Sequence, residues 1–503
     1  MVYRRRSALV LVTGLAAALA ACTQVPADLG RGQVQEQVRA RGWPAEAADA
    51  APPLVAEITA APLSAESAIR LALVNNPDIR AHYAELGIAA AAVYRAGHIR
   101  NPLFSASVLD SNRSGEMDQI TYGLAASFSD LITLPSRKRL ARRQFTEVQY
   151  QVGAELVRLA AETEHAYYDY VTARQVAAMR GQVAKAAAVS LQLAERYFDA
   201  GNMTPRDLAL ERAAAAEAEV DRLQAEDAAL AARTALADLL GLPLAGAWEV
   251  PAQLALPVTQ EDDLGELLAL ARHSRLDLAS ASARAERLAE ELCYTNWRRW
   301  LGELELGVER ERETDGARLL GPTLSWEIPI FTQHRDQLLE VDAGLQMAIA
   351  EVARLMLDSD NAVRLAHAGV QNARARAETF RTRLLPARIE ATQQAQLEEN
   401  FMLIGTFELL LSKQREYNAY QGYLEALGDY WMTRAALAQA VGRRLPSGAR
   451  ASGTSAAAED YLGTAAPAHG GHGAMHPGAE DSGEGKQQGE EQQQEAEDAH
   501  RHH

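Results

Sequence analysis

The sequence has little cysteine, few aromatic residues and no excess of positive charge. Cys22 and Cys293 are the only two cysteines, which does not support a disulfide framework. The formal net charge of −17 provides no basic field to attract phosphates, so we expect no nucleic-acid partner. The low aromatic content, beside abundant alanine and leucine, favours long helices that pack closely.

The sequence also lacks any apolar run long enough for a transmembrane helix. The stretch from Ala8 to Ala21 follows three arginines and is too short to span a bilayer, as is typical of a signal peptide. It ends in Leu-Ala-Ala-Cys, which looks like a bacterial lipoprotein signal. We therefore expect a signal peptide over 1–21 and a lipid anchor on Cys22, with an ordinary cleavage site as the alternative. The residue after Cys22 is Thr23. An aspartate at that position would resemble an inner-membrane retention signal, so the threonine favours the outer membrane.

Motifs of catalysis are absent from the sequence. There is no GxxxxGK[ST] phosphate loop, no His-Glu-x-x-His pair and no G-x-S-x-G elbow. We expect no enzymatic activity and no cofactor. Cys293, between Leu292 and Tyr294 in a helical segment, is expected to be a buried, inert thiol.

The chain divides into five parts by composition and pattern. After the signal peptide, residues 22–62 are rich in proline and alanine and are expected to form an extended tether. The segments 63–252 and 253–446 have the same order of patterns, with Asp78 corresponding to Asp277, which indicates one duplicated unit. The polar, acidic segment 447–503 cannot bury a core and is expected to be a disordered tail.

Each half contains a very long helical pattern. Apolar residues step by three and four from Phe145 to Tyr170, which predicts a coiled-coil seam on a helix from Pro135 to about Ala200. A second long helix is predicted from about Gln333 toward Asn400. A glycine and a threonine follow each helix, and then a helix returns. These tip turns contain Gly201, Thr204, Gly405 and Thr406, and we expect the two glycines to relax the backbone in the same way.

Two segments, about 102–131 and about 301–331, change to the alternating pattern of strands, which gives about four strands per chain. Lipid does not tolerate unpaired edges, so a membrane role requires a trimer that closes a β-barrel of about twelve strands. The apolar face would contact lipid, and Glu303, Glu305 and Glu309 would line the lumen. A soluble β-subdomain is the alternative. The fold class is therefore mainly α with a small membrane β part.

The duplicated unit resembles the TolC family of outer-membrane efflux proteins over about 63–444. The resemblance depends on "NPDIRAHYAELGIAAAAVYRAGHIRNP", the paired strands, "EIPIF" and the two Gly-Thr turns. It implies a homotrimer whose long helices form a hollow α-barrel in the periplasm. It also implies two partners, a periplasmic adaptor (membrane fusion) protein and an inner-membrane pump, of the resistance-nodulation-division type. The chain departs from the family pattern at Asp130, where a proline is common, and at "FTQHRDQ", which lacks the usual glycine.

The resemblance implies that the tip turns form the periplasmic constriction, which makes Asp207 and Glu408 candidate gate residues. A ring of either acid in a trimer would attract cations. The alternative is that each acid only stabilises the start of its helix. The tail residues His469, His472, Met475 and His476 could bind copper, silver, zinc or nickel weakly, or have no role.

Together these features predict a lipid-anchored outer-membrane channel that exports substrates, heavy-metal cations among them, from the periplasm or an inner-membrane pump. A duct for drugs or for type I secreted polypeptides is a second hypothesis. A lipid-anchored coiled-coil scaffold without a pore is a third.

Overall fold

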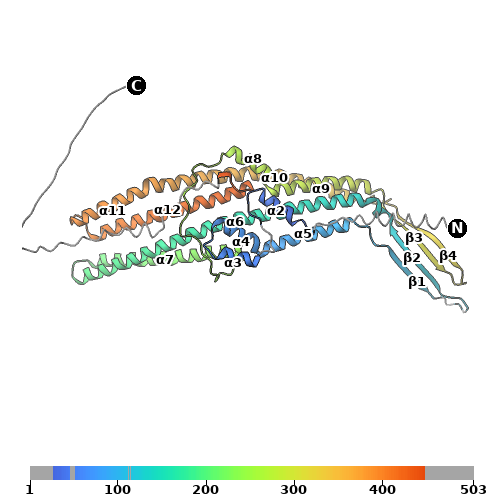
Figure 1. Ribbon diagram of the computed structural model, residues 1–503, viewed down its shortest axis with the longest axis horizontal. Coiled ribbons are helices and arrows are strands. Elements are labelled where there is room, and N and C mark those ends of the chain that lie inside the picture. The colour runs from blue at the N-terminus through green and yellow to red at the C-terminus, as the bar shows by residue number, and fades with distance from the viewer. Residues whose placement is uncertain (1–26, 46–50, 111–112, 114, 448–503) are drawn as a thin grey trace, which may run out of the picture. The chain divides into compact units, whose positions relative to one another are not determined.

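A computed structural model describes residues 27–45, 51–110, 113 and 115–447 (Figure 1). All of these residues belong to one compact unit. The predicted signal peptide, the lipidation residue Cys22 and the tail residues His469, His472, Met475 and His476 lie outside the described residues.

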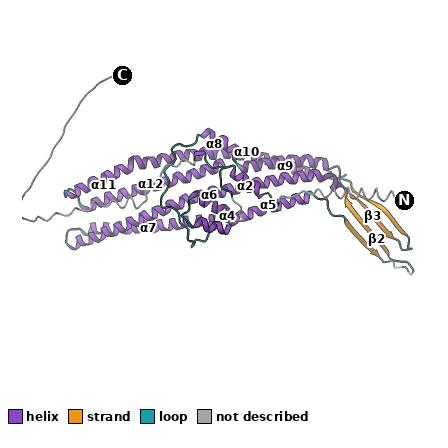
Figure 2. Ribbon diagram, viewed as in Figure 1, coloured by secondary structure: helices purple, strands orange, loops and turns teal. Residues whose placement is uncertain are grey.

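Helices make up most of the described chain, and one sheet of four strands completes it (Figure 2). The elements are α2 (Arg31–Arg39), α3 (Ala51–Thr59), α4 (Ala65–Asn75), α5 (Pro77–Ala96), β1 (Leu103–Leu109), β2 (Gln119–Ser127), α6 (Phe128–Asp199), α7 (Pro205–Leu240), α8 (Leu264–Ser274), α9 (Leu276–Arg298), β3 (Glu303–Arg312), β4 (Arg318–Glu327), α10 (Arg335–Thr379), the π-helix η2 (Phe380–Leu384), α11 (Leu385–Asn400) and α12 (Thr406–Val441).

The order of elements repeats, as the sequence predicted. A helix pair, two strands, a long helix and a returning helix occur first from α4 to α7 and again from α8 to α12. Asp78 and Asp277 both lie in the first turn of the second helix of their pair. The mainly helical fold with a small four-stranded sheet is therefore confirmed.

The first long helix begins earlier than predicted. Helix α6 contains 72 residues, about 108 Å at 1.5 Å per residue, and starts at Phe128 with Pro135 inside its first turns. The earlier start has a local cause, because the Ser127 hydroxyl accepts a 3.2 Å hydrogen bond from the Asp130 amide and caps the helix. Pro135 is the eighth residue of α6, beyond the four amides that have no partner within a helix, so its missing N–H leaves the Leu131 carbonyl without its usual helical bond.

The second long helix is interrupted where the sequence predicted one continuous helix. The π-helix η2 separates α10 from α11. Pro386 is the second residue of α11 and lacks the N–H that an unbroken helix would donate to the Thr382 carbonyl.

The segment expected to be an extended tether contains two helices, so that expectation was wrong for its described part. Val34 and Val38 on α2 are fully buried, and Trp43 is 2% exposed. All three join the main core, where α2 packs against α6. Residues spaced by four place both valines on one helix face, which explains the burial.

The main core lies where α2, α4, α6 and α12 pack together, and it contains three of the six tryptophans. Trp43, Trp248 and Trp431 are buried there, at 2%, 2% and 6% exposure. Cys293 differs from expectation, because its side chain is exposed on α9 rather than buried. Among the described helices, none combines the length and the apolar character that crossing a membrane requires.

The four strands form one antiparallel sheet in the order β1-β2-β3-β4. Strands β2 and β3, which come from different halves of the chain, pair at its centre, with Leu124 opposite Val308. Within the described residues β1 and β4 each have one strand neighbour, so both have a free edge.

Candidate functional site

The register of the sheet separates an acidic face from an apolar face. Residues directly opposite each other share a face, and successive residues along a strand alternate. Glu305 lies opposite Ser127 and Ser325, and Glu309 lies opposite Gly123 and Gly321. The other face carries apolar residues in the same register: Phe104, Leu124, Leu304, Leu306, Val308, Leu324 and Trp326.

Three acids predicted to line a lumen therefore lie together, and the structure adds two more. Glu303 lies directly opposite Glu327, and Glu311 follows Glu309 on the same face of β3. The sequence pattern did not place Glu327 on this face, because its pairing with Glu303 depends on the hairpin register. The face as a whole carries five carboxylates: Glu303, Glu305, Glu309, Glu311 and Glu327.

The five acids are not electrostatically equal. Glu303 forms an ion pair with Arg100, and Glu311 accepts a hydrogen bond from the side-chain Nε2 of Gln119. Glu305 and Glu309 have no ion pair within 4.0 Å in the part of the chain that the structure describes. In the described chain Glu311 and Glu327 also lack an ion pair, so four of the five carboxylates have no cationic partner and Glu303 alone is compensated.

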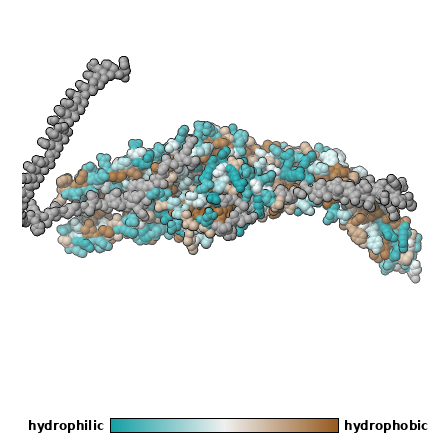
Figure 3. Space-filling model, viewed as in Figure 1, coloured by the Kyte–Doolittle hydropathy of each residue, from teal (hydrophilic) through white to brown (hydrophobic). Residues whose placement is uncertain are grey.

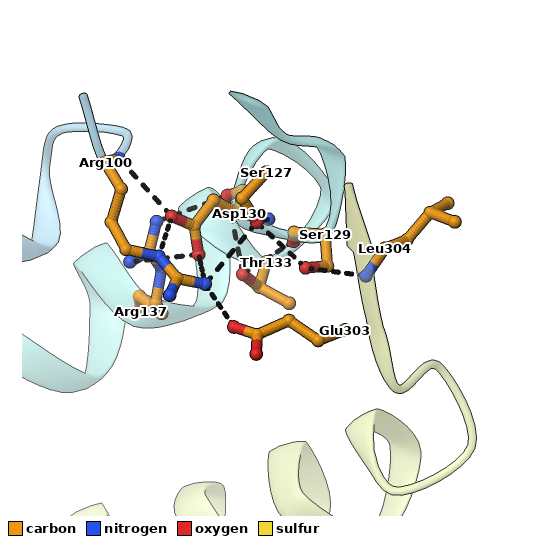
Figure 4. A network of polar contacts seen from close by, with 8 residues as sticks. All are labelled: Arg100, Ser127, Ser129, Asp130, Thr133, Arg137, Glu303 and Leu304. Atoms are coloured by element: carbon orange, nitrogen blue, oxygen red, sulfur yellow. Dashed lines mark hydrogen bonds and ion pairs between the residues drawn. The ribbon is translucent and has the colours of Figure 1, made fainter. Parts of the chain in front are cut away.

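A polar network ties the sheet to the helices at the corner between β2 and α6 (Figure 4). The Arg100 Nε donates a 2.8 Å hydrogen bond to Asp130 Oδ2, and its Nη2 contacts Glu303. Arg137 Nη2 donates to the Asp130 carbonyl at 3.2 Å. The Leu304 amide donates to the Ser129 hydroxyl at 3.4 Å. The network thus joins the loop before β1, the start of α6 and the start of β3.

Asp130 is the centre of this network and is largely buried, with 9% of its side chain exposed. Burial alone raises the pKa of Asp130, but the hydrogen bond from Arg100 and the charge of Arg137 outweigh it. The net effect is a pKa below the ordinary value. The same contacts, led by the bond to Asp130, raise the pKa of Arg100. Both groups are therefore charged at neutral pH.

The second strand-to-helix junction also departs from ordinary backbone geometry. Gln333 and His334 have φ angles of 50° and 46°, in the left-handed region that non-glycine residues rarely adopt. The sequence lacks the usual glycine here, so two residues with side chains take conformations that glycine would adopt at lower energy.

The first tip turn ends α6 through a left-handed glycine. Gly201 has a φ of 76°, and its amide donates to the Phe198 carbonyl at 2.9 Å. The Asn202 amide donates to the Tyr197 carbonyl at 2.8 Å, which completes a Schellman motif. Thr204 then caps α7: its hydroxyl accepts from the Asp207 amide at 3.1 Å and donates to Asp207 Oδ2 at 2.7 Å.

The second tip turn uses the same motif with different residues. Met402 takes the left-handed position, at a φ of 58°, and its amide donates to the Glu399 carbonyl at 2.8 Å. Gly405 has a φ of −83° and occupies the N-cap of α12, the position that Thr204 takes in the first turn. The expectation that Gly201 and Gly405 relax the backbone alike was therefore wrong.

The candidate gate acids do correspond to each other. Asp207 and Glu408 each lie three residues after an N-cap, in the first turn of a returning helix. Asp207 is half-buried and bonded to Thr204, whereas Glu408 is exposed. Thr406 donates a 3.1 Å hydrogen bond to Glu399 Oε1, which closes the second turn.

The two tip turns lie beside each other. The rings of Tyr197 and Phe407 meet edge to face, with centroids 6.2 Å apart. Phe407 also borders a surface hollow of about 540 Å³ that Thr204 and Asp207 line. The described ranges contain no group of three or more His, Cys, Asp or Glu side chains placed to hold a metal ion.

Comparisons with known proteins agree with this architecture. Residues 68–242 match the family described as Outer membrane efflux protein. The chain is 27% identical to Protein CyaE of Bordetella pertussis over 333 residues, which covers 61% of this chain and 69% of CyaE. It is 23% identical to the cobalt-zinc-cadmium resistance protein CzcC of Cupriavidus metallidurans over 404 residues, which covers 78% of this chain and 93% of CzcC.

Solved structures show the same fold. The CusC structure, described in terms of transmembrane channel formation, has a TM-score of 0.62 at 17% identity and covers 75% of this chain and 92% of its own. VceC from Vibrio cholerae has a TM-score of 0.61 at 18% identity, and the match covers 76% of this chain and 96% of VceC. The resemblance predicted from the sequence is therefore confirmed.

Proposed function

Because the chain carries an outer membrane efflux protein domain in the fold of the solved efflux channels, we propose that three copies form a passive duct through the outer membrane. Each copy would contribute its four strands to a closed β-barrel of about twelve. The free edges of β1 and β4 support closure by neighbouring copies, because lipid does not satisfy unpaired backbone groups.

The cargo that we propose is heavy-metal cations, and the acidic face of the sheet carries this proposal. In a trimer Glu305 and Glu309 would each form a ring of three uncompensated carboxylates around the lumen. Rings of acids concentrate cations and repel anions. The similarity to CzcC, whose name states cobalt, zinc and cadmium resistance, supports the same class of cargo.

The remaining parts of the chain take proposed roles in this duct. Residues 1–21 would be a signal peptide, and Cys22 would carry acyl chains that anchor the protein in the outer-membrane lipid. Residues 63–252 and 253–446 would be the two structural repeats, and 447–503 a tail whose His469, His472, Met475 and His476 contact metal transiently.

The helical part would reach into the periplasm and end at the tip turns. There Asp207 and Glu408 would line the gate, and a periplasmic adaptor would connect the duct to an inner-membrane pump of the resistance-nodulation-division type. The pump would supply the energy, since the sequence contains no phosphate-binding loop for nucleotide hydrolysis.

Planar-bilayer recording on the full-length protein tests the duct directly. We expect discrete conductance steps and a reversal potential that shows cation selectivity. A protein that never raises conductance, even with Asp207→Ala and Glu408→Ala together, would be a scaffold and not a pore.

Metal tolerance of a deletion strain tests the cargo. We expect the strain to lose tolerance to at least one of copper, silver, zinc and cobalt, and to recover it with the intact gene. Unchanged tolerance to all four, with lost tolerance to drugs or lost polypeptide secretion, would reassign the cargo and leave the duct standing.

A further inference from the structure

The apolar face of the sheet ends in a cluster of arginines at the β3–β4 hairpin. Arg310 and Arg312 follow Val308 on the same face of β3, because they are two and four residues further along the strand. Arg318 lies directly opposite Arg312 on β4. The basic cluster, Arg310, Arg312 and Arg318, therefore lies on the face that the proposed function turns toward lipid.

The cluster lacks the compensation that such charges normally have. Like charges directly opposite each other destabilise a sheet, and Arg312 and Arg318 are such a pair. Within the described residues neither Arg310 nor Arg318 has an ion-pair partner within 4.0 Å, and both side chains are exposed. The Arg312 Nη2 donates to the Asp118 carbonyl at 3.2 Å, and its Nε is buried without a partner.

The position of the cluster matches the boundary of a membrane. Eight residue steps separate Leu304 from Arg312, about 27 Å along the strand and less when the strand tilts. The apolar band of an outer-membrane barrel is about 25 Å tall. Figure 3 shows the change on the visible face, where brown near the helices gives way to teal and white toward the hairpin ends.

Exposed tryptophans mark the opposite end of the same band. Trp297, Trp300 and Trp326 are 50%, 56% and 51% exposed, and all three lie where α9 and the sheet meet. The other three tryptophans are in the core. Tryptophan is enriched at membrane–water interfaces, so these residues locate one boundary and the basic cluster the other.

We propose that the basic cluster binds the phosphate groups of anionic lipid headgroups at the outer end of the barrel. Guanidinium groups match phosphate oxygens in charge and geometry, and a single guanidinium can donate two hydrogen bonds to one phosphate. A phosphorylated lipid would compensate the opposed Arg312 and Arg318 and hold the hairpin at the headgroup level. This inference rests on the proposed outer-membrane duct.

Native mass spectrometry of the full-length protein in detergent tests the site. The probes are lipid A, which carries two phosphates, dephosphorylated lipid A, phosphatidylcholine and inorganic phosphate. We expect tight binding of lipid A alone, and a loss of about fivefold in affinity for each arginine replaced by glutamine. Arg310→Lys should retain more affinity than Arg310→Gln, because the charge remains.

Arg364→Gln is the matched control, since Arg364 is exposed in α10 away from the sheet. Equal binding of lipid A before and after dephosphorylation, or equal losses in the control and in the cluster variants, overturns the proposal. Binding of inorganic phosphate as tight as lipid A identifies a free-anion site and overturns it as well.

Conductance of the same preparations separates this inference from the proposed function. A protein that forms pores but shows no phosphate-dependent lipid binding lacks the lipid site and remains a duct. Phosphate-dependent lipid binding without any conductance would overturn the duct and leave the lipid site standing.

Discussion

Arg100 and Asp130 are joined by a hydrogen bond of 2.8 Å between Nε and Oδ2, across the corner where the sheet meets α6. The contact also reaches Glu303 in the second half of the chain through the same guanidinium. One arginine therefore fixes three segments that are distant in sequence. The family resemblance implies a proline at the position of Asp130, and in this chain an ionic network holds the corner.

Asp130→Asn is expected to destabilise the protein by about 2 kcal/mol at neutral pH, the contribution of hydrogen bonds to a charged group. The folded-state pKa of Asp130 is lowered, so its stabilisation is present above the unfolded value of about 3.9 and is lost as the pH falls through the folded pKa. Denaturant unfolding at pH 7 and at acidic pH checks this. The difference in the free energy of unfolding between wild type and variant should become smaller as the pH falls.

Glu351→Gln is a suitable control for Asp130. Its pKa is also lowered, by a hydrogen bond from Arg354, but the pair is exposed within one helix. Exposed pairs contribute little, so this variant should denature like wild type. Equal stability of Asp130→Asn and wild type at pH 7 would contradict the structural role of the network.

The acids of the sheet should differ in their effect on ion selectivity. Glu305→Gln and Glu309→Gln should each lower the preference for cations, because both carboxylates lack an ion pair in the described chain. Glu303→Gln should change it less, since Arg100 already compensates Glu303. Reversal potentials in a salt gradient measure the three variants. An effect of Glu303→Gln as large as that of Glu305→Gln would show that the ion pair does not hold in the assembled pore.

At the first tip turn, one pair of variants separates a gate from a helix cap. Thr204→Ala removes the hydroxyl that caps α7 and should destabilise the protein by about 1 kcal/mol without changing selectivity. Asp207→Asn keeps the size of the side chain and removes its charge, so it should reduce cation selectivity if Asp207 lines the gate.

Glu217→Gln, an exposed acid further along α7, provides the comparison for these tip variants. Selectivity that is the same in Asp207→Asn and Glu217→Gln would leave Asp207 with the capping role alone. The melting temperature at fixed protein concentration measures the cap, and single-channel recording measures the gate.

Local patterns were enough to predict the strands and one long helix in each half, but not the start of α6 or the π-helix η2. The alternation of Leu304, Leu306 and Val308 with glutamates repeats every two residues, and a strand shows that period directly. The corner network could not be predicted in this way, because Arg100, Asp130 and Glu303 come together only after two helices and a strand pairing have formed. The pairing of Glu303 with Glu327 depends likewise on the hairpin register.

The tip turns show a different limit of sequence reasoning. Gly201 and Gly405 are each followed by a threonine within three residues, so the two stretches look alike. The backbone pairs Gly201 with Met402 instead, since these two residues share the left-handed conformation. Residue identity suggested that Gly201 aligns with Gly405, whereas the φ angles align Gly201 with Met402. The sequence could not predict this, because methionine is not a residue that indicates a left-handed conformation.

Substitutions at these positions therefore give opposite results that distinguish the two alignments. Gly201→Ala should destabilise the protein by about 1 kcal/mol, because its Cβ meets open space and only the backbone strain changes. Met402→Gly should stabilise it by a similar or smaller amount, since Met402 is 92% exposed and loses little packing. Gly405→Ser should stabilise it slightly, because a serine at a φ of −83° can cap α12. Thermal midpoints at fixed protein concentration measure all three, and a destabilised Gly405→Ser beside a neutral Met402→Gly would restore the pairing of the two glycines.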